Sequence, residues 1–295
     1  MTKLRKDALK YPVFHLLIVV CLGMGLASLP VSRIFESFIA DKAVVIMAST
    51  ITTRVILSAL ALFFIFRYGF YKSLSPKLTI IGHIAVIPAL LVAINNFPVY
   101  GVLKGTILLT PPSESYYVLY AFYCLSIGLF EEITFRGLVF PLCVYIFRKS
   151  KYDVFWATFT SSAVFGLVHL LNLFGGASVG ETILQVGYSF LVGAMCALSV
   201  ALTKSIYSAI LIHAVYDVGG LLCSKDLNMV SGVNGGAVNQ WDSVTVTITA
   251  VLGVITAIYM IIVCFKLKKG PLLSLYGFDA ENIKSNVEEN SAQSN

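Results

Sequence analysis

The feature that most constrains this sequence is a set of ionisable side chains inside long apolar runs. They lie in three stretches, Leu129–Phe140, Ser162–Asn172 and Leu211–Gly219. An ionisable group at membrane depth costs at least about 2.5–3.5 kcal/mol on insertion scales, so a folded chain keeps one mainly where it is paired or lines a polar cavity. The stretches therefore predict one buried polar site, and its candidate residues are Glu131, Glu132, Arg136, His169, His213 and Asp217.

The composition is that of a membrane protein. Of the 295 residues, 58% are hydrophobic and only 12% are charged, whereas roughly 25% are charged in soluble domains. The net charge of +6 comes mostly from short Lys/Arg clusters between apolar runs, which is typical of cytoplasmic loops and not of a nucleic-acid-binding face. We therefore expect the lipid bilayer as a partner and no nucleic acid.

Eight apolar runs approach the length of about 20 residues that a transmembrane helix needs. We expect an all-α, polytopic membrane domain of about eight transmembrane helices over residues 1–269, followed by a disordered cytoplasmic tail over 270–295. The first run, Tyr11–Leu29, is longer than the apolar region of a signal peptide, so we expect it to be retained. The expected spans are about 12–31, 43–66, 78–97, 116–147, 153–171, 180–202, 206–223 and 243–265.

The charges of the loops predict the orientation of the chain. With eight spans, the Lys/Arg clusters before the first span and after the second, fourth, sixth and eighth spans all fall on one side. The opposite loops hold only Arg33, Lys42, Lys104 and Lys225. The positive-inside rule then predicts that both termini are cytoplasmic and that the 98–114 and 172–180 loops lie outside. The plasma membrane is the expected location.

The fourth span, at 116–147, is too long for one straight crossing. It contains Gly137 and Pro141. Because Pro141 cannot donate a hydrogen bond to the carbonyl four residues back, and its ring clashes there, we expect a kink about one turn after Arg136.

The two neighbouring glutamates are predicted to differ. Residues four apart share a face of a helix, so Glu132 can pair with Arg136, while Glu131 points roughly 100° away. A free carboxylate in a low-dielectric cavity suits a general base that acts on water. The alternative is that both glutamates are structural partners, one for Arg136 and one for Arg54 in the second span.

The two histidines repeat this four-residue spacing. Phe165 and His169 lie four apart on the fifth span, as do His213 and Asp217 on the seventh. A lone histidine in an apolar run is most simply a core residue bonded to a backbone carbonyl. An imidazole with an acidic neighbour can instead be oriented, kept protonated or made a better metal ligand. By a simple count of 1.5 Å per residue along each span, the spans must be tilted or offset for these groups to meet.

The motifs Glu-Glu-x-x-x-Arg, Phe-x-x-x-His and His-x-x-x-(Asn/Asp), in this order, resemble those of CPBP intramembrane proteases, the CAAX prenyl protease type II or Abi family. The resemblance covers roughly residues 115–220. It implies that Glu131 and His169 activate a water for peptide-bond hydrolysis, and that His213 and Asp217 serve the oxyanion or a metal. The family is also described as metallopeptidases. Its prenyl proteases have Asn where this chain has Asp217.

Asp217 leaves three interpretations open. It can be protonated by burial, it can orient His213, or it can bind zinc with His213 and His169, a ligand set that suits a catalytic zinc. We favour orientation of His213, because their spacing places the pair together without other helices. The six cysteines form no C-x-x-C pair, so they suggest neither a disulfide framework nor a thiolate zinc site.

The sequence therefore predicts an intramembrane endopeptidase that uses a glutamate- and histidine-activated water, with a peptide or lipidated peptide as substrate. A prenylated CAAX-like C-terminus and a bacteriocin-related peptide are both open. One alternative is a non-catalytic membrane scaffold or bacteriocin self-immunity protein. Another is a proton-coupled transporter, because intramembrane Glu and His also build proton relays; the two halves show no inverted repeat, which argues against transport.

Overall fold

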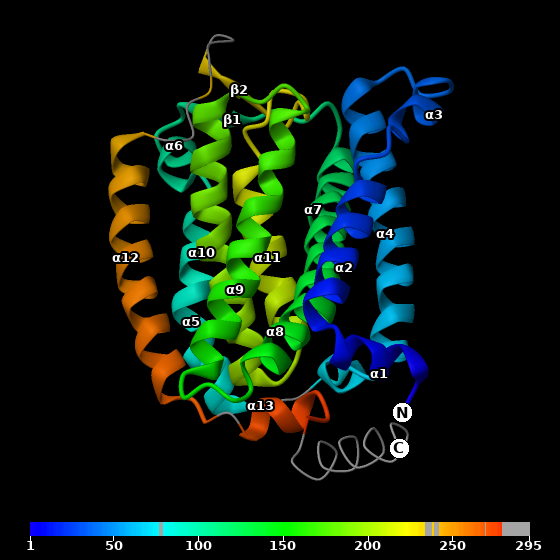
Figure 1. Cartoon of the computed structure of the whole chain (residues 1–295). Helices are drawn as coiled ribbons and strands as arrows, with labels where there is room; N and C mark the ends of the chain where they lie inside the picture. The colour runs from blue at the N-terminus through cyan, green and yellow to red at the C-terminus, as the bar shows by residue number, and fades with distance from the viewer. Residues whose placement is uncertain (77–78, 234–237, 239–241, 269, 279–295) are drawn as a thin grey trace, which may run out of the picture.

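The structure is a computed structural model that describes residues 1–76, 79–233, 238, 242–268 and 270–278. Over this part of the chain the protein is a bundle of helices with roughly aligned axes (Figure 1). Long apolar helices confirm the all-α membrane class. Six helical segments are long and apolar enough to cross a membrane: Pro12–Glu36, which contains α2 (Pro12–Ala27) and α3 (Ser32–Glu36), α4 (Lys42–Tyr68), Glu114–Phe147, Asp153–Leu173, α10 (Val179–Thr203) and α12 (Ser243–Lys266).

Two of the eight predicted spans form shorter helices. α5 (Ile80–Asn95) has 16 residues and α11 (Tyr207–Gly220) has 14, so both fall short of the roughly 20 residues that cross a bilayer. The backbone just before α11 is buried, and there Ile206 donates its N–H to the carbonyl of Ser73 in η1 (Tyr71–Leu74) at 2.9 Å. Of the eight predicted spans, six are confirmed as helices of spanning length.

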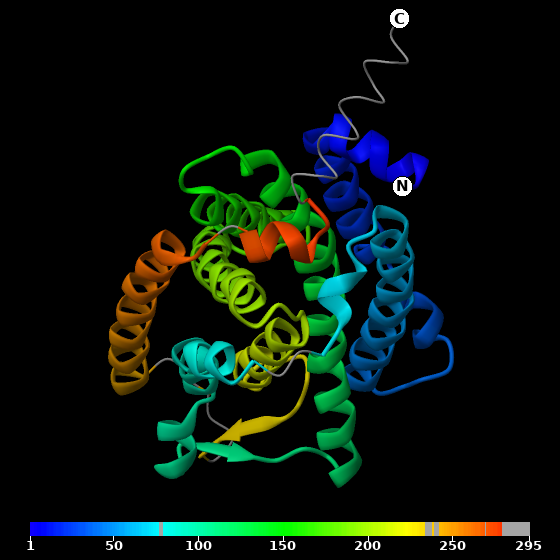
Figure 2. The ribbon, with the colours of Figure 1, turned by 90° about the horizontal axis from the view of Figure 1, so that it is seen from below.

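The two ends of the bundle carry different short elements (Figure 1). One end holds α3, α6 (Val99–Leu103) and an antiparallel pair of strands, β1 (Ile107–Leu109) and β2 (Val230–Gly232). The other end holds α1 (Lys3–Lys10), η1 and α13 (Gly270–Leu275), and α13 lies across it in the view from below (Figure 2). The sequence predicted neither strand, because three-residue strands are too short to show a period.

The side chain of Arg5 joins the N-terminal helix to α4 and to the segment after α13. Its Nη1 donates to the carbonyls of Tyr68 at 2.5 Å and Gly69 at 3.1 Å, and its Nη2 donates to those of Tyr276 at 2.8 Å and Gly277 at 3.0 Å. Gly69 and Gly277 have φ values of 71° and 67°, a left-handed conformation that ends a helix and favours glycine. One buried cation therefore fixes three segments that are far apart in the sequence.

The start of the predicted tail is ordered, which corrects the expectation of disorder from residue 270. α13 occupies Gly270–Leu275, and the side chains of Tyr276 and Phe278 are buried. Both rings pack against Phe70, at centroid distances of 6.0 and 5.8 Å. These aromatic contacts fix residues 276–278 against Phe70, although the polar sequence that follows them had suggested disorder. The rest of the predicted tail, 279–295, lies outside the described residues.

The long fourth run is interrupted beside the predicted site. α7 (Glu114–Thr134) passes into a π-helical turn, η2 (Phe135–Val139), and then into α8 (Phe140–Phe147). The N–H of Phe140 donates to the carbonyl of Phe135, five residues back, and Pro141 has no N–H to continue the ordinary pattern. A π turn thus interrupts the α-helix close to the predicted kink, but it contains Arg136 and does not follow it. Such π turns are frequent at functional sites.

Packing between five helical segments brings the three ionisable stretches together. α7 packs between α4 and α11, and α9 (Asp153–Leu167) continues into the 3₁₀ helix η3 (Val168–Leu173), which packs against α10. The close approach of α7 and α11 requires Gly128, because a Cβ there would lie 3.1 Å from the backbone nitrogen of Ala214.

Candidate functional site

Glu132 lies at the centre of the site and is fully buried. Its Oε1 accepts a hydrogen bond from Arg136 Nη1 at 3.0 Å, one helical turn further on, and from His213 Nδ1 at 2.7 Å across the α7–α11 interface. A buried carboxylate needs such compensation, because removing it from water is costly. Glu132 therefore binds two cationic or cation-forming side chains, one on its own helix and one on α11.

Arg136 ties this group to α10 and α9. Its Nη2 donates to the carbonyl of Gly193 at 2.7 Å, and its guanidinium lies 4.7 Å from the centre of the Phe165 ring. A Cβ at position 193 would lie 3.3 Å from Arg136 Nη2 and 3.1 Å from Phe165 Cδ1. Glycine at this position thus allows the guanidinium to reach the backbone of α10.

Glu131 faces a different direction and is more accessible. Its side chain is 11% exposed, whereas that of Glu132 is 0% exposed. Its Oε2 lies 3.7 Å from His213 Nε2, which is an ion-pair distance and too long for a hydrogen bond. Of the two neighbouring carboxylates, Glu131 is therefore the one that water can reach.

His213 has a different orienting partner from the one that the sequence suggested. Its Nδ1 is hydrogen-bonded to Glu132, and its Nε2 lies 3.6 Å from Asp217 Oδ2. That Oδ2 is buried and has no hydrogen-bond partner within the described chain. We expected Asp217 to orient the ring. Glu132 makes the hydrogen bond instead, because α7 and α11 approach closely at this level.

His169 is placed less tightly than His213. Its Nδ1 is 3.0 Å from the carbonyl of Phe165 and its Nε2 is 3.5 Å from Ser189 Oγ. Between the described residues, no hydrogen bond or salt bridge joins His169 to the carboxylates of the site. The Phe165 ring stands edge-on to both imidazoles, at 5.3 Å from His169 and 5.7 Å from His213. The structure thus connects five of the six predicted residues directly and places His169 across an aromatic ring from them.

A possible metal-binding group is present, with a composition that the sequence did not suggest. The ligand atoms of Glu132, Cys196 and His213 lie within 4.8 Å of one another, and all three residues are buried. Oxygen, sulfur and nitrogen donors are of the type that binds zinc. In the present arrangement Glu132 Oε1 and His213 Nδ1 are bonded to each other, so an ion would have to replace that bond. The zinc set suggested from sequence was His169, His213 and Asp217.

One face of α10 supplies contacts that sequence reasoning missed. Ser189 faces His169, Gly193 accepts from Arg136, and Cys196 lies beside Glu132 and His213. These three residues are spaced by four and three positions, so they form one stripe along the helix. A stripe of small residues on an apolar helix was the available signal, but it is also common in ordinary helix packing.

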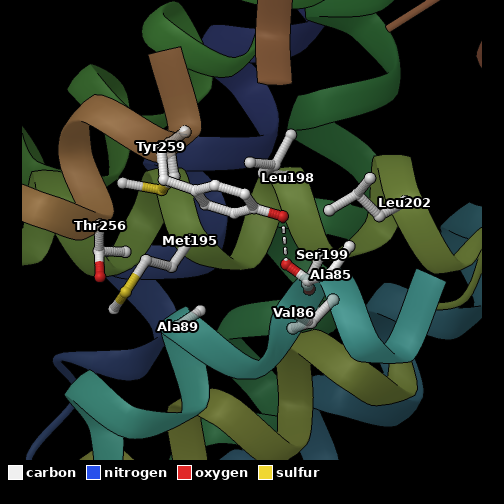
Figure 3. A pocket seen from close by; sticks show the side chains of 10 residues that line it. Ala85, Val86, Ala89, Met195, Leu198, Ser199, Leu202, Thr256 and Tyr259 are labelled. Atoms are coloured by element: carbon white, nitrogen blue, oxygen red, sulfur yellow. Dashed lines mark hydrogen bonds between the residues drawn. The ribbon is translucent and has the colours of Figure 1, made fainter. Parts of the chain in front are cut away.

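A small pocket lies elsewhere, between α5, α10 and α12 (Figure 3). Apolar side chains dominate its lining, among them Ala89, Met195 and Leu198. The Tyr259 hydroxyl is used locally, because it donates to the carbonyl of Ala85 at 2.6 Å. The pocket contains no carboxylate or imidazole, so it has no part in the chemistry of the site.

Comparison with known proteins gives one match. Residues 113–219 match the family described as type II CAAX prenyl endopeptidase Rce1-like. The matched segment begins just before α7 and ends within α11, so it contains all six candidate residues. No curated protein and no solved structure matches the chain. The resemblance carried by the three motifs is therefore confirmed over residues 113–219, which are similar to the Rce1-like family of type II CAAX prenyl endopeptidases.

Proposed function

We propose that this protein is an intramembrane endopeptidase in which Glu131 activates the water that attacks a peptide bond. The observation that carries the proposal is the pairing of Glu131, whose side chain is 11% exposed, with the more deeply buried frame of Glu132, Arg136 and His213. The match of residues 113–219 to an endopeptidase family supports it. A positioned general base contributes about 10²–10⁴-fold to such a reaction.

The frame gives each group a chemical task. Glu131 takes a proton from the water while the water oxygen attacks the substrate carbonyl carbon. His213 is held by Glu132 through Nδ1, which leaves Nε2–H of a protonated ring free to donate to the developing oxyanion. Arg136 neutralises Glu132, so this carboxylate orients the ring without adding uncompensated charge. The Glu131 carboxylic acid then returns its proton to the leaving amine.

His169 is the second group that we assign to the water. The family resemblance implies this role. Its partial exposure and its long Ser189 contact leave Nε2 able to change partner when substrate binds. A zinc ion held by Glu132, Cys196 and His213 would act as a Lewis acid when bound. The proton transfers assigned to Glu131 and His213 do not require it.

We propose that the bundle crosses the plasma membrane eight times with both termini in the cytoplasm. α5 and α11 run alongside the longer helices (Figure 1). The backbone just before α11 is buried at Ile206 and bonded to Ser73, which supports a membrane-embedded helix below the usual length. The Lys/Arg-rich ends of α1, α4 and α12 lie at the same end of the bundle, as the positive-inside rule requires.

The proposed substrate is a peptide with a prenylated CAAX-like C-terminus, and a bacteriocin-related peptide is the second substrate class to test. Purified protein in detergent is incubated with a fluorogenic prenylated peptide, its unprenylated counterpart and a bacteriocin-leader peptide. We expect cleavage of the prenylated peptide by wild type and its loss in Glu131→Gln. A folded Glu131→Gln protein that keeps its function in cells, with no cleavage by either form, would instead indicate a scaffold or immunity protein.

A further inference from the structure

Arg54 is a second arginine inside a membrane-spanning helix, and it lacks the compensation that Arg136 has. It lies on α4, near the middle of the span, and is only partly exposed. Its Nη1 is buried without a hydrogen-bond partner in the described chain. No salt bridge among the described residues includes it. The sequence left open a pairing of Arg54 with one of the two glutamates, and the structure gives both glutamates other partners.

The Arg54 guanidinium faces the helix that carries Glu131. It stacks on the ring of Phe130, with its carbon 4.7 Å from the ring centre, and Phe130 directly precedes Glu131. α4 and α7 lie side by side in the view along the bundle (Figure 2). The charge is also close enough to interact with Asp217 and Tyr123. Arg54 is therefore oriented toward the candidate site and not toward the lipid.

An arginine at this depth with an unused N–H group needs an anionic partner. Stacking on Phe130 provides only part of the stabilisation, because a ring face satisfies no N–H hydrogen bond. Guanidinium groups bind carboxylates with two parallel hydrogen bonds, which fixes both position and direction. No carboxylate of the described chain fills this role, which leaves the position open to a carboxylate from a ligand.

We propose that Arg54 binds the C-terminal carboxylate of the peptide substrate and so fixes which peptide bond reaches Glu131. The inference rests on the proposed endopeptidase function and adds a specificity-determining residue outside the segment that matches the family.

The distance along the bundle supports this assignment. α4 and α7 both start at the end of the bundle that carries α3 and β1 (Figure 1). At 1.5 Å per residue, Arg54 lies about 18 Å from the start of α4 and Glu131 about 26 Å from the start of α7. The Cα atoms of the two residues thus differ by about 8 Å in depth. The Arg54 side chain covers part of this difference, because its guanidinium stacks on Phe130, directly before Glu131. A carboxylate bound by Arg54 would therefore lie close to the level of Glu131.

A lipid phosphate fits this position less well than a peptide carboxylate. Phospholipid head groups lie at the surfaces of a hydrocarbon core about 30 Å thick. Arg54, about 18 Å from the end of its helix, lies near the middle of that core. A peptide that enters the site to be cleaved brings its carboxylate to this depth, whereas a head group does not.

The test compares two peptides that differ only at the C-terminus. Both are dansyl-labelled and contain S-farnesyl-cysteine followed by three aliphatic residues, and one ends in a free acid and the other in an amide. In wild type we expect the amide to have a KM about 10- to 100-fold higher, the size of a charge-assisted hydrogen-bonded pair. Arg54→Gln should raise the KM of the acid to that of the amide, leave the amide unchanged, and change kcat little. Arg54→Lys should restore part of the preference.

Arg67→Gln is the matched control, because Arg67 is an exposed arginine at the end of the same helix. It should leave the preference for the acid unchanged. An Arg54→Gln protein that stays folded and loses activity equally toward acid and amide would overturn the inference. So would a wild type without preference between the two peptides.

Binding is measured separately from cleavage, by fluorescence anisotropy with the Glu131→Gln protein and the same two peptides. Binding that is selective for the acid, and is lost in the Glu131→Gln, Arg54→Gln double variant, supports the carboxylate site. If wild type also cleaves neither peptide, that failure of cleavage rejects the proposed function and leaves the role of Arg54 standing. Cleavage by wild type with equal binding of acid and amide rejects only the role of Arg54.

Discussion

On the α7–α11 side of the site, Glu132 is fully buried and accepts hydrogen bonds from Arg136 at 3.0 Å and His213 at 2.7 Å. On the α9 side, His169 is partly exposed, and its Nε2 lies 3.5 Å from Ser189 Oγ. Both sides come from a four-residue spacing on an apolar helix, Glu132 with Arg136 on one side and Phe165 with His169 on the other. The difference lies in the neighbours. Gly128 and Gly193 let backbones close around the first group, while η3 lies at the end of its helix.

This contrast indicates a division of tasks between a rigid frame and an adaptable side. The frame contains charges that cannot change partner without leaving a buried charge uncompensated. The α9 side contains a ring that can rotate toward water or substrate. Substitutions in the frame should therefore affect folding first, and substitutions at accessible groups should affect turnover first.

Glu132→Gln should be the most damaging substitution. It keeps the shape of the side chain but removes the counter-charge of the fully buried Arg136, and breaking a buried pair typically costs about 3–5 kcal/mol. We expect a large fall in the midpoint of thermal unfolding in detergent, together with loss of activity. A thiol-reactive dye can report it, because Cys124, Cys143 and Cys196 are buried in the folded state. The control is Glu114→Gln, at the exposed start of the same helix; an equal fall there would contradict the buried-pair explanation.

Glu131→Gln should affect catalysis and leave folding intact. The Glu131 side chain is 11% exposed, and among the described residues its one polar approach is the 3.7 Å distance to His213, so its neutral isostere should cost little stability. We expect kcat to fall about 10²–10⁴-fold, the usual contribution of a general base, with a thermal midpoint close to that of wild type. If the Glu131→Gln and Glu132→Gln proteins had the same midpoint of thermal unfolding, the proposed difference between the buried frame and Glu131 would be wrong.

The two histidines give the most direct comparison of the two sides. His213→Gln removes a buried partner of Glu132, so it should lower both the thermal midpoint and activity. His169→Gln should lower activity by about 10²-fold, within the range for positioned acid–base groups, while the midpoint changes little. His83→Gln is the control, because this exposed histidine contacts only the Thr79 carbonyl among its described polar partners, at 2.8 Å. A His169 variant as unstable as the His213 variant would show that the α9 side is also part of the frame.

Sequence reasoning identified the site because ionisable residues are so rare in apolar runs that their positions and spacing are informative. It predicted the Glu132–Arg136 pair and the interruption near Pro141, since both follow from local helix geometry. It did not predict that Glu132 binds His213, because that contact depends on how closely α7 and α11 approach. The count of 1.5 Å per residue along each span assumed that every span starts at the membrane surface, whereas the backbone just before α11 is buried and bonded to η1.

The contribution of α10 was missed for a related reason. Serine, glycine and cysteine in an apolar helix carry no charge pattern, so Ser189, Gly193 and Cys196 gave no signal above that of ordinary packing. The same applies to the ordered residues after Gly270, where aromatic contacts with a distant segment outweigh local polarity. In both places the deciding interactions join residues far apart in the sequence.

Asp217→Asn should have the smallest effect. Asp217 lies 3.6 Å from His213 and its buried Oδ2 has no hydrogen-bond partner in the described structure, while Glu132 holds the ring through Nδ1. An asparagine keeps the shape and can donate to a developing oxyanion, which an ionised aspartate cannot do. Since a neutral hydrogen bond contributes about 0.5–1.5 kcal/mol, activity should stay within about tenfold of wild type and should survive a chelator. Loss of cleavage in Asp217→Asn, together with loss of wild-type activity in a chelator and recovery with zinc, would instead make Asp217 a metal ligand beside His213.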